Sequence, residues 1–158
     1  MKRPRKSKVS SKPFDAEDVA SIDAIAAAGM RRLRLKPSDR AEVKMKKITK
    51  VIDEHLFKKK KKNKEALLEL ASQLGCLYGN ILRDKVGWEW CIVNDEGDEF
   101  LGIGPSDKSA ILAPIAYVHS QMTAPISGDN TSMLLFNMIK GEGGLISEGK
   151  PGEYVAIG

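Results

Sequence analysis

The sequence predicts an α+β protein in which helices come first, a small antiparallel sheet of about three strands follows, and short helices end the chain. Two observations indicate this order. Between residues 14 and 85, apolar side chains recur every three or four positions, a spacing typical of helices. After Gly87, the stretch "WEWCIV" is aromatic and β-branched, and an acidic turn separates it from "FLGIG". This pattern indicates an antiparallel hairpin.

The composition is that of an ordinary globular protein. The 158 residues are 42% hydrophobic and 30% charged, which suits one domain with extensions. No apolar run reaches the roughly 18 to 20 residues of a membrane-spanning helix, and no apolar segment follows the basic start as in a secretory signal. Cys76 and Cys91 lie within apolar stretches and are expected to be reduced core thiols. We therefore expect a cytoplasmic protein with no membrane partner.

The first residues differ from the rest in composition. Residues 1–13 are rich in Lys, Arg, Ser and Pro and contain a single aliphatic side chain. Such a segment buries too little surface to offset the entropy of ordering it. We expect residues 1–13 to be a disordered basic tail and residues 14–158 to form a single domain.

Two helices are expected before residue 60. Asp15 is placed to cap the first, with Asp18 favouring its N-terminus. Its expected buried stripe is Val19, Ile22, Ala26, Gly29 and Leu33. Pro37 interrupts the pattern, and a second helix can begin at Ser38. Its expected stripe is Met45, Ile48, Val51, Ile52 and His55.

A third helix, from about residue 64 to 85, is the most strongly indicated element. It is apolar on more than one face, which is typical of a helix buried on several sides. Its apolar residues are Leu67, Leu68, Leu70, Ala71, Leu74, Leu77, Tyr78, Ile81 and Leu82. Gly75 and Gly79 lie one turn apart on one side, and each costs up to about 1 kcal/mol relative to alanine. Close approach of another backbone across these glycines would offset that cost, so we expect a packed central helix.

The second half of the chain alternates short elements. Gly87 is expected to end the third helix with a positive φ. In the following strand, Trp88, Trp90 and Ile92 point to one face while Cys91 and Val93 point to the other. Residues 110–114 are expected to be a third short strand, 115–122 and 130–139 two helices, and 153–158 a final strand or packed tail.

The order of motifs from residue 74 to 139 resembles a family of small bacterial domains of unknown function. The matching positions are Gly75, Gly79, Gly87, Trp90 and Pro114, within "LGCLYGNILRDKVGWEWCIV" and "AILAPIAYVHSQM". The resemblance covers about residues 40–140 and implies an α+β fold with no known activity. That family usually has an acidic residue after its second glycine, where this chain has Asn80. Proteins of this kind often look like accessory or immunity-type proteins, and by that analogy the resemblance implies such a role here.

The sequence gives little indication of catalysis. No Gly-x-Ser-x-Gly elbow places a nucleophile. His119 is expected to be a core or rim histidine, and His55 to interact with the C-terminal dipole of its helix. Cys76 and Cys91 are interpreted as packing residues. We therefore expect a protein that is not an enzyme.

No cofactor or metal is indicated either. The acidic turn "NDEGDE" spans about four residues, too few to wrap a calcium ion as an EF-hand loop does. No cysteine and histidine spacing typical of zinc occurs. The stretch "GIGPSDKSA" lacks the spacing of a Walker phosphate loop.

Charge divides the chain into two halves. Residues 1–62 carry 20 Lys and Arg against 8 Asp and Glu, a net of +12, and residues 63–158 carry 6 against 13, a net of −7. The basic residues form three clusters: residues 2–8; Arg31, Arg32 and Arg34; and Lys58, Lys59, Lys60, Lys61 and Lys62. These clusters are either ordinary solvated surface or contacts for an anionic partner. Aromatic residues other than Phe57 do not interleave them, so no stacking platform for single strands is visible.

These observations favour a non-enzymatic interaction protein of the accessory or immunity type. The face that bears the tryptophans is either covered by helices, and then part of the core, or exposed, and then an interaction patch. The alternative function is nucleic-acid association, in which the basic N-terminal half binds phosphates.

Overall fold

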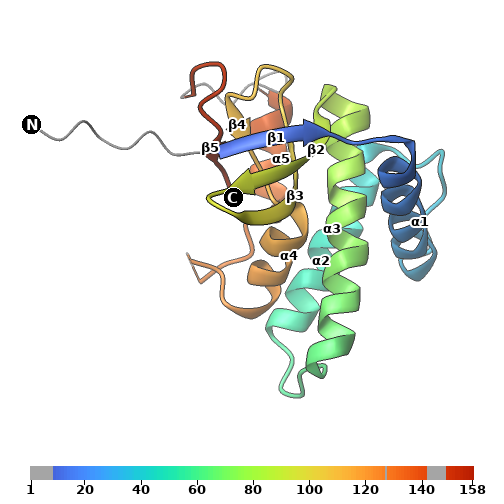
Figure 1. Ribbon diagram of the computed structural model, residues 1–158. Coiled ribbons are helices and arrows are strands. Elements are labelled where there is room, and N and C mark those ends of the chain that lie inside the picture. Colours follow the sequence, from blue (N-terminus) through green and yellow to red (C-terminus); the bar gives the residue numbers. More distant parts are fainter. Residues whose placement is uncertain (1–8, 127, 142–148) are drawn as a thin grey trace, which may run out of the picture.

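The computed structural model describes residues 9–126, 128–141 and 149–158 and confirms the α+β class (Figure 1). The helices are α1 (Ala16–Arg32), α2 (Ala41–Leu56), α3 (Lys64–Val86), α4 (Pro114–Thr123) and α5 (Ser132–Gly141). The strands are β1 (Val9–Pro13), β2 (Glu89–Asp95), β3 (Asp98–Gly104), β4 (Ala110–Ile111) and β5 (Val155–Ala156). The elements follow the predicted order except for β1, which lies where a disordered segment is expected.

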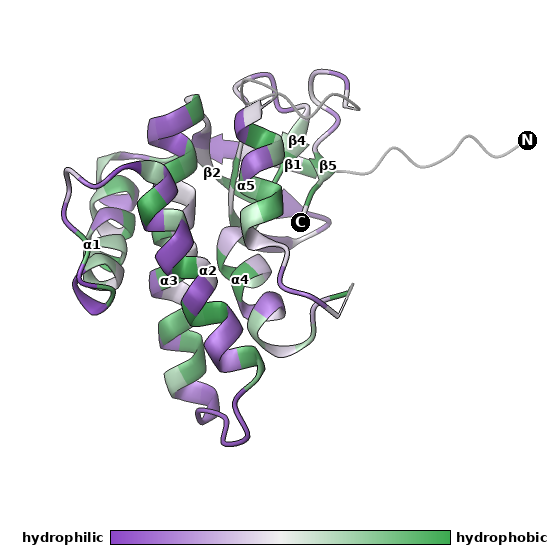
Figure 2. Ribbon diagram, turned by 180° about the vertical axis from the view of Figure 1, so that it is seen from behind, coloured by the Kyte–Doolittle hydropathy of each residue, from purple (hydrophilic) through white to green (hydrophobic). Residues whose placement is uncertain are grey.

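Helix α3 runs through the middle of the molecule, as the sequence predicts. It contacts the other four helices and β2. Figure 1 shows α1 and α4 on either side of it, with the sheet across its C-terminal end. In Figure 2, the hydrophobic sides of the helices face one another and their hydrophilic sides face outward. The side chains of Leu74, Tyr78 and Leu82 are fully buried, while Leu68, in the second turn, is half exposed rather than part of the core.

The two glycines of α3 lie against two different neighbours. An added Cβ at Gly75 would lie 2.6 Å from the Cα of Ile115, in the first turn of α4. This close approach of two backbones is the one the sequence predicts. An added Cβ at Gly79 would instead overlap the indole ring of Trp90, so here the glycine accommodates a side chain rather than a backbone.

The helix ends follow from local hydrogen bonds. Asp15 and Asp18 form a capping box at the start of α1, with each carboxylate accepting the backbone N–H of the other residue. At the start of α3, the side-chain amide oxygen of Asn63 accepts the backbone N–H of Ala66. Gly87 ends α3 in the left-handed conformation, with φ of 75°.

Helix α2 begins at Ala41 and not at the predicted Ser38. The side chain of Asp39 accepts the backbone N–H of Lys36 at 2.7 Å, which closes a turn around Pro37. That turn occupies the residues expected in the first turn of the helix. Arg40 precedes α2 without a side-chain cap.

The three-stranded antiparallel sheet has the order β1-β2-β3. Its third strand is β1 and not residues 110–114, because Val9 pairs with Asp95 and Pro13 with Cys91. Residues 9–13 are therefore ordered, which corrects the expected boundary of the tail, and residues 1–8 lie outside the described residues. Within 110–114, β4 pairs in parallel with β5 as a separate two-stranded sheet, joined to β3 by a single bridge to Leu112.

Both faces of the hairpin are covered near α3. Trp88 and Trp90 are buried, and Trp90 stacks on Phe14 with 5.7 Å between ring centroids. On the other face, Cys91 and Val93 pack in a second cluster with Ile111. The tryptophan face is thus part of the core, which decides between the two readings of the sequence in favour of packing.

One residue of the α1 stripe differs from expectation. Ile22, Ala26 and Gly29 are buried, but Val19 is 39% exposed. Asp23 lies level with Arg83, to which it is paired. Val19, one turn earlier in α1, therefore lies level with the C-terminal end of α3, where few α3 side chains are left to cover it.

Candidate functional site

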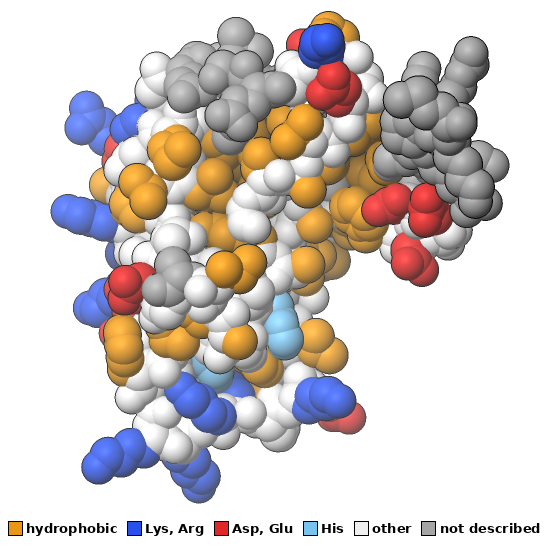
Figure 3. All heavy atoms as spheres, turned by 90° about the vertical axis from the view of Figure 1, so that its left-hand side faces the viewer, with side chains coloured by type: hydrophobic (Ala, Val, Ile, Leu, Met, Phe, Trp, Pro, Cys, Tyr) orange, Lys and Arg blue, Asp and Glu red, His pale blue; other side chains and the backbone are white. Residues whose placement is uncertain are grey.

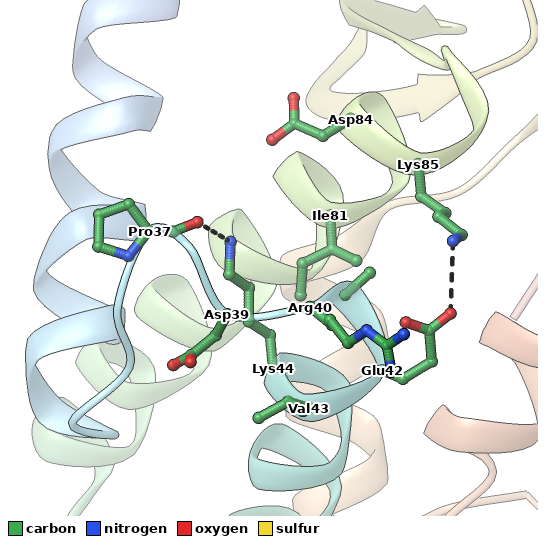
Figure 4. Close-up of a pocket in the computed structure, with 10 residues that line it drawn as sticks. Pro37, Asp39, Arg40, Glu42, Val43, Lys44, Ile81, Asp84 and Lys85 are labelled. Carbon is green, nitrogen blue, oxygen red and sulfur yellow. Dashed lines mark hydrogen bonds and ion pairs between the residues drawn. The ribbon is translucent and has the colours of Figure 1, made fainter.

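A groove lies where α1, the turn before α2, and the C-terminal half of α3 meet. Its larger part has a volume of about 580 Å³, and a second part of about 250 Å³ continues it toward α1. The two parts share four lining residues: Pro37, Lys44, Ile81 and Asp84. Figure 4 shows the larger part, with Ile81 at the back and charged side chains around the rim.

The turn around Pro37 forms one wall of the groove, and several contacts hold it in place. Arg34 adopts a left-handed conformation with φ of 54°, which ends α1 and turns the chain. The ammonium of Lys47 donates to the carbonyls of Leu33 and Arg34 at 3.3 and 3.5 Å. The ammonium of Lys44 donates to the carbonyl of Pro37 at 3.4 Å across the groove (Figure 4).

The floor of the groove is apolar. Ile81 and Leu77 of α3 contribute to it, together with Ala26 and Met30 of α1. The two helices come close because Gly29 lies against the backbone of α3, where an added Cβ would be 2.8 Å from the carbonyl oxygen of Gln73. The small side chains of α1 thus leave a shallow space between the helices.

The rim carries charges of both signs. Arg83 of α3 pairs with Asp23 of α1 at 3.1 Å and with its neighbour Asp84 at 2.9 Å. Partial burial acts to lower the pKa of Arg83, but hydrogen bonds and charges from Asp84 and Asp23 outweigh it, so the pKa is raised. The guanidinium is therefore fixed in its charged form between two carboxylates.

Glu42 forms a second charged group on the rim. Its carboxylate lies 3.4 Å from the ammonium of Lys85 (Figure 4) and 3.5 Å from that of Lys140. The hydrogen bond from its own backbone N–H is the largest cause that lowers the pKa of Glu42, and burial opposes it. The charge and hydrogen bond of Lys85 and a hydrogen bond from Lys140 lower the pKa further. Because these groups are partly exposed, the pairs add little stability and mainly set the charge pattern of the surface.

A chain of hydrogen bonds connects the groove to the sheet. The indole N–H of Trp90 donates to the side-chain oxygen of Asn80 at 3.0 Å. The amide nitrogen of Asn80 donates in turn to Asp23 at 3.0 Å, and Asp23 also accepts from Arg83. The side chain at position 80 therefore both accepts and donates a hydrogen bond. Asparagine can do both, whereas the resembling family usually has an acid at this position.

The polar groups that line the groove are carboxylates, ammonium and guanidinium groups and the amide of Asn80. The lining residues include no imidazole, thiol, hydroxyl or phenol that could act as a nucleophile. An apolar floor within a charged rim is typical of a protein-docking surface.

The arginines singled out from the sequence have structural roles. Arg31 and Arg32 lie in the last turn of α1, where positive charge is favourable at the negative end of the helix dipole. Arg32 also donates to the side chain of Gln73 at 2.6 Å. Arg34 ends the helix, as described above. The cluster at residues 2–8 lies outside the described residues.

The five consecutive lysines form the loop between α2 and α3, one of the two alternatives that the charge pattern allows. The ammonium of Lys61 turns inward and donates to the carbonyls of His55 and Leu56 at 2.7 and 2.6 Å. It caps the end of α2. Four lysines of the run project from the loop and are exposed: Lys58, Lys59, Lys60 and Lys62.

The five positions of the resemblance all have packing or turn roles. Gly75 and Gly79 admit Ile115 and Trp90, and Gly87 ends α3. Pro114 is buried and opens α4, where its missing N–H costs nothing. None of these residues lines the groove.

The buried thiols and the two histidines lie away from the groove. Burial raises the pKa of Cys76 to about 12 and, as the largest cause, also raises that of Cys91. His55 is buried, as expected for a member of the second helix's stripe, and its Nδ1–H donates to the carbonyl of Met122 at 3.1 Å. His119 is half-buried at the edge of α4.

Sequence reasoning did not find the groove. Its walls come from segments up to about 60 residues apart, and its charged residues are typical of any helix surface. The one local signal is Pro37, which from the sequence alone indicates only a break between helices.

Comparison with known proteins identifies a family. A profile of a domain of unknown function, DUF3806, matches residues 44–132, which is more than half of the chain. The match runs from α2 through α3, the hairpin and α4 to the start of α5, and it leaves out α1. No curated protein and no solved structure matches the chain. The chain thus belongs to the DUF3806 family of domains of unknown function.

Proposed function

We propose that this protein is a non-catalytic binding module whose protein partner docks in the groove between α1, α2 and α3. The observation that carries the proposal is the combination of an apolar floor around Ile81 with a rim of paired charges that includes Asp84 and Glu42. In an accessory or immunity-type role, such a surface would act only by binding a complementary surface on its partner.

The charges of the rim favour a protein over a polyanion. Carboxylates of Asp23, Asp39 and Asp84 line the groove beside its basic groups. A phosphate chain lying there would meet these carboxylates and be repelled. A protein segment with charges of both signs and one or two apolar side chains can match both the rim and the floor.

The alternative, phosphate binding through the basic half, has weaker support. Arg31 and Arg32 of the basic half lie in the last turn of α1, where Arg32 donates to Gln73, and Lys61 caps α2. The basic clusters therefore do not line one groove of the kind that follows a nucleic-acid backbone.

Photo-crosslinking tests the proposal in a lysate of the source cells. A photoreactive benzophenone residue replaces Val43, which is 40% exposed on the groove rim, or, as a matched control, Leu134, which is 60% exposed on α5. The expected result is one protein crosslinked in stoichiometric amounts from position 43 and not from position 134. Adding Asp84→Lys should remove the crosslink. Equal crosslinking from both positions, or none from position 43, would refute groove docking.

A further inference from the structure

The loop between α2 and α3 forms a projecting end of the molecule, far from the groove. We call residues 57–63 together with Leu68 the lysine tip. Figure 1 shows it as the turn of the α2–α3 hairpin beyond the end of α4. In Figure 2, a hydrophilic loop is flanked by hydrophobic stretches on both helices.

Two apolar side chains at the lysine tip are exposed. Phe57, directly after α2, is 74% exposed, and Leu68, in the second turn of α3, is 50% exposed. Both helices bury their apolar side chains elsewhere along their contact, for example Ile52 and Leu70. Leu67, beside Leu68, is buried, so Leu68 is exposed because it lies on the outward face of α3, while Phe57 lies just past the end of α2.

The lysines lie between these two apolar residues along the chain. Lys61 fixes the loop against α2 by capping it, which leaves the other four lysine side chains on the outside. Within the part of the chain that the structure describes, these four make no hydrogen bond or ion pair through their side chains. They are Lys58, Lys59, Lys60 and Lys62. The lysine tip thus carries positive charge that no nearby carboxylate neutralises by direct contact.

The acidic residues are concentrated away from the lysine tip. The turn of the β2–β3 hairpin carries four carboxylates: Asp95, Glu96, Asp98 and Glu99. In Figure 3, Lys and Arg side chains gather at the lower end and along one edge, and Asp and Glu side chains gather mainly in the upper part. An anionic surface would attract the lysine tip and repel the acidic hairpin, so the molecule would approach it in one orientation.

We propose that the lysine tip binds the surface of an anionic membrane. Phe57 and Leu68 enter the boundary between headgroups and acyl chains, and the lysines contact anionic headgroups. Each lysine near such a surface contributes about 1 kcal/mol, and long lysine side chains keep their charge in the headgroup layer while their stems cover apolar surface. Together, apolar insertion and a basic cluster supply the two contributions that stable peripheral binding needs.

The shape of the lysine tip favours a membrane over a nucleic acid. It is the convex turn of a helical hairpin (Figure 1), which can meet a plane but does not enclose a strand. A single-strand site stacks successive bases on several aromatic rings, and here Phe57 is one ring beside an aliphatic Leu68. No helix among the described residues is long and apolar enough to cross a membrane. Contact with a membrane surface needs no spanning helix, so it differs from the kind of membrane partner that the sequence argues against.

Flotation with lipid vesicles tests this proposal on the full chain. The vesicles are phosphatidylcholine alone or phosphatidylcholine with about one third phosphatidylglycerol, and salt varies from about 0.05 to about 0.5 M. The wild-type protein should float with the anionic vesicles only, and less at high salt. Replacing Lys58, Lys60 and Lys62 by Gln should weaken binding about 100-fold, since three lysines at about 1 kcal/mol each are removed.

Matched variants separate the lysine tip from general charge and hydrophobicity. Replacing the exposed Lys36, Lys46 and Lys50 by Gln removes the same charge elsewhere and should weaken binding less than threefold. The double variant F57S/L68S should lose at least tenfold in vesicle affinity. The variant L134S/M138S, which alters two exposed apolar residues of α5, should not.

Four results would overturn the proposal: equal flotation with neutral vesicles, no flotation with either, equal losses in the two triple variants, or equal losses in the two double variants. A labelled single-stranded oligonucleotide is tested in parallel. Binding to it that depends on Lys58, Lys60 and Lys62, without binding to vesicles, would assign the lysine tip to nucleic acid instead. Because the lysine tip and the groove share no residue, either proposal can fail while the other holds.

Discussion

The indole ring of Trp90 occupies the space on α3 that the missing side chain of Gly79 leaves. A Cβ on Gly79 would overlap the six-membered ring of Trp90. The indole N–H donates to Asn80, the residue after the glycine, at 3.0 Å. One turn of α3 therefore fixes both the position and the orientation of the Trp90 side chain in β2.

Gly79→Ala should destabilise the protein although alanine is the better helix former. The added methyl group displaces the indole ring, and overpacking of this kind costs about 1–3 kcal/mol. Alanine returns up to about 1 kcal/mol in helix propensity, so the net loss should be about 1–2 kcal/mol in the free energy of unfolding by urea. Gly141→Ala is the control, because an added Cβ there meets no atom of the described residues within 4 Å. A Gly79→Ala protein as stable as the wild type would contradict the packing described for α3.

Asn80→Asp should lower stability at neutral pH and less so at acidic pH. Asn80 donates to Asp23 at 3.0 Å, and an aspartate there would place two carboxylates in contact. Their repulsion should cost about 1 kcal/mol at pH 7. Protonation of one of the two removes it, so the variant should approach the wild type as the pH falls toward about 4. Thermal unfolding across this pH range measures the effect.

The double variant D23N/N80D provides the control for that repulsion. An asparagine at position 23 can donate to the new aspartate, so the loss at pH 7 should largely disappear. If Asn80→Asp is equally destabilising with and without Asp23→Asn, charge repulsion is not the cause.

Glu42 should contribute to the pH dependence of stability. Its pKa is lowered below 4.5 by its backbone hydrogen bond and by Lys85 and Lys140. A carboxyl with a lowered folded-state pKa stabilises the protein above its unfolded pKa, and this contribution is lost as the pH falls through the folded pKa. Glu42→Gln should therefore lower the Tm at pH 7 and have little effect near pH 3. Glu96→Gln in the exposed hairpin turn is the comparison. An effect of Glu42→Gln that is the same at both pH values would contradict the ion pairs on the rim.

The two thiols should react only when the protein unfolds. Cys76 and Cys91 are fully buried, and burial raises the pKa of Cys76 to about 12. The native protein at pH 8 should therefore be labelled by a thiol reagent at least 100-fold more slowly than the protein in denaturant, since both thiolate formation and access are suppressed. Rapid labelling of either thiol in the native protein would show that the interior is more open than described.

The elements with strong local patterns were predictable from the sequence. The apolar periodicity of α3, the Asp15 cap and the left-handed Gly87 all correspond to features that the structure confirms. In each case the physical cause lies within one helix or turn. The burial of Trp90 also follows the alternation of side chains along a strand.

The elements that depend on distant pairing were not predictable in the same way. β1 has the composition of a flexible tail, "VSSKP", and is a strand only because β2, about 80 residues later, supplies its hydrogen-bond partners. Ser11 in this strand also hydrogen-bonds the hydroxyl of Tyr154 at 2.7 Å, near the other end of the chain. The groove is of the same kind, because no single segment contains its floor and its rim.

The affinity of the crosslinked partner for defined variants tests groove docking most directly. Once that partner is purified, its Kd for the wild-type protein is compared with its Kd for Asp84→Lys and for Asp98→Lys, which makes the same charge change in the β2–β3 hairpin. Reversing the rim charge should raise the Kd at least tenfold, while the hairpin variant should change it less than twofold, as expected for one charge contact inside an interface and one outside it. An unchanged Kd for Asp84→Lys, or a larger increase for Asp98→Lys, would place the binding surface elsewhere.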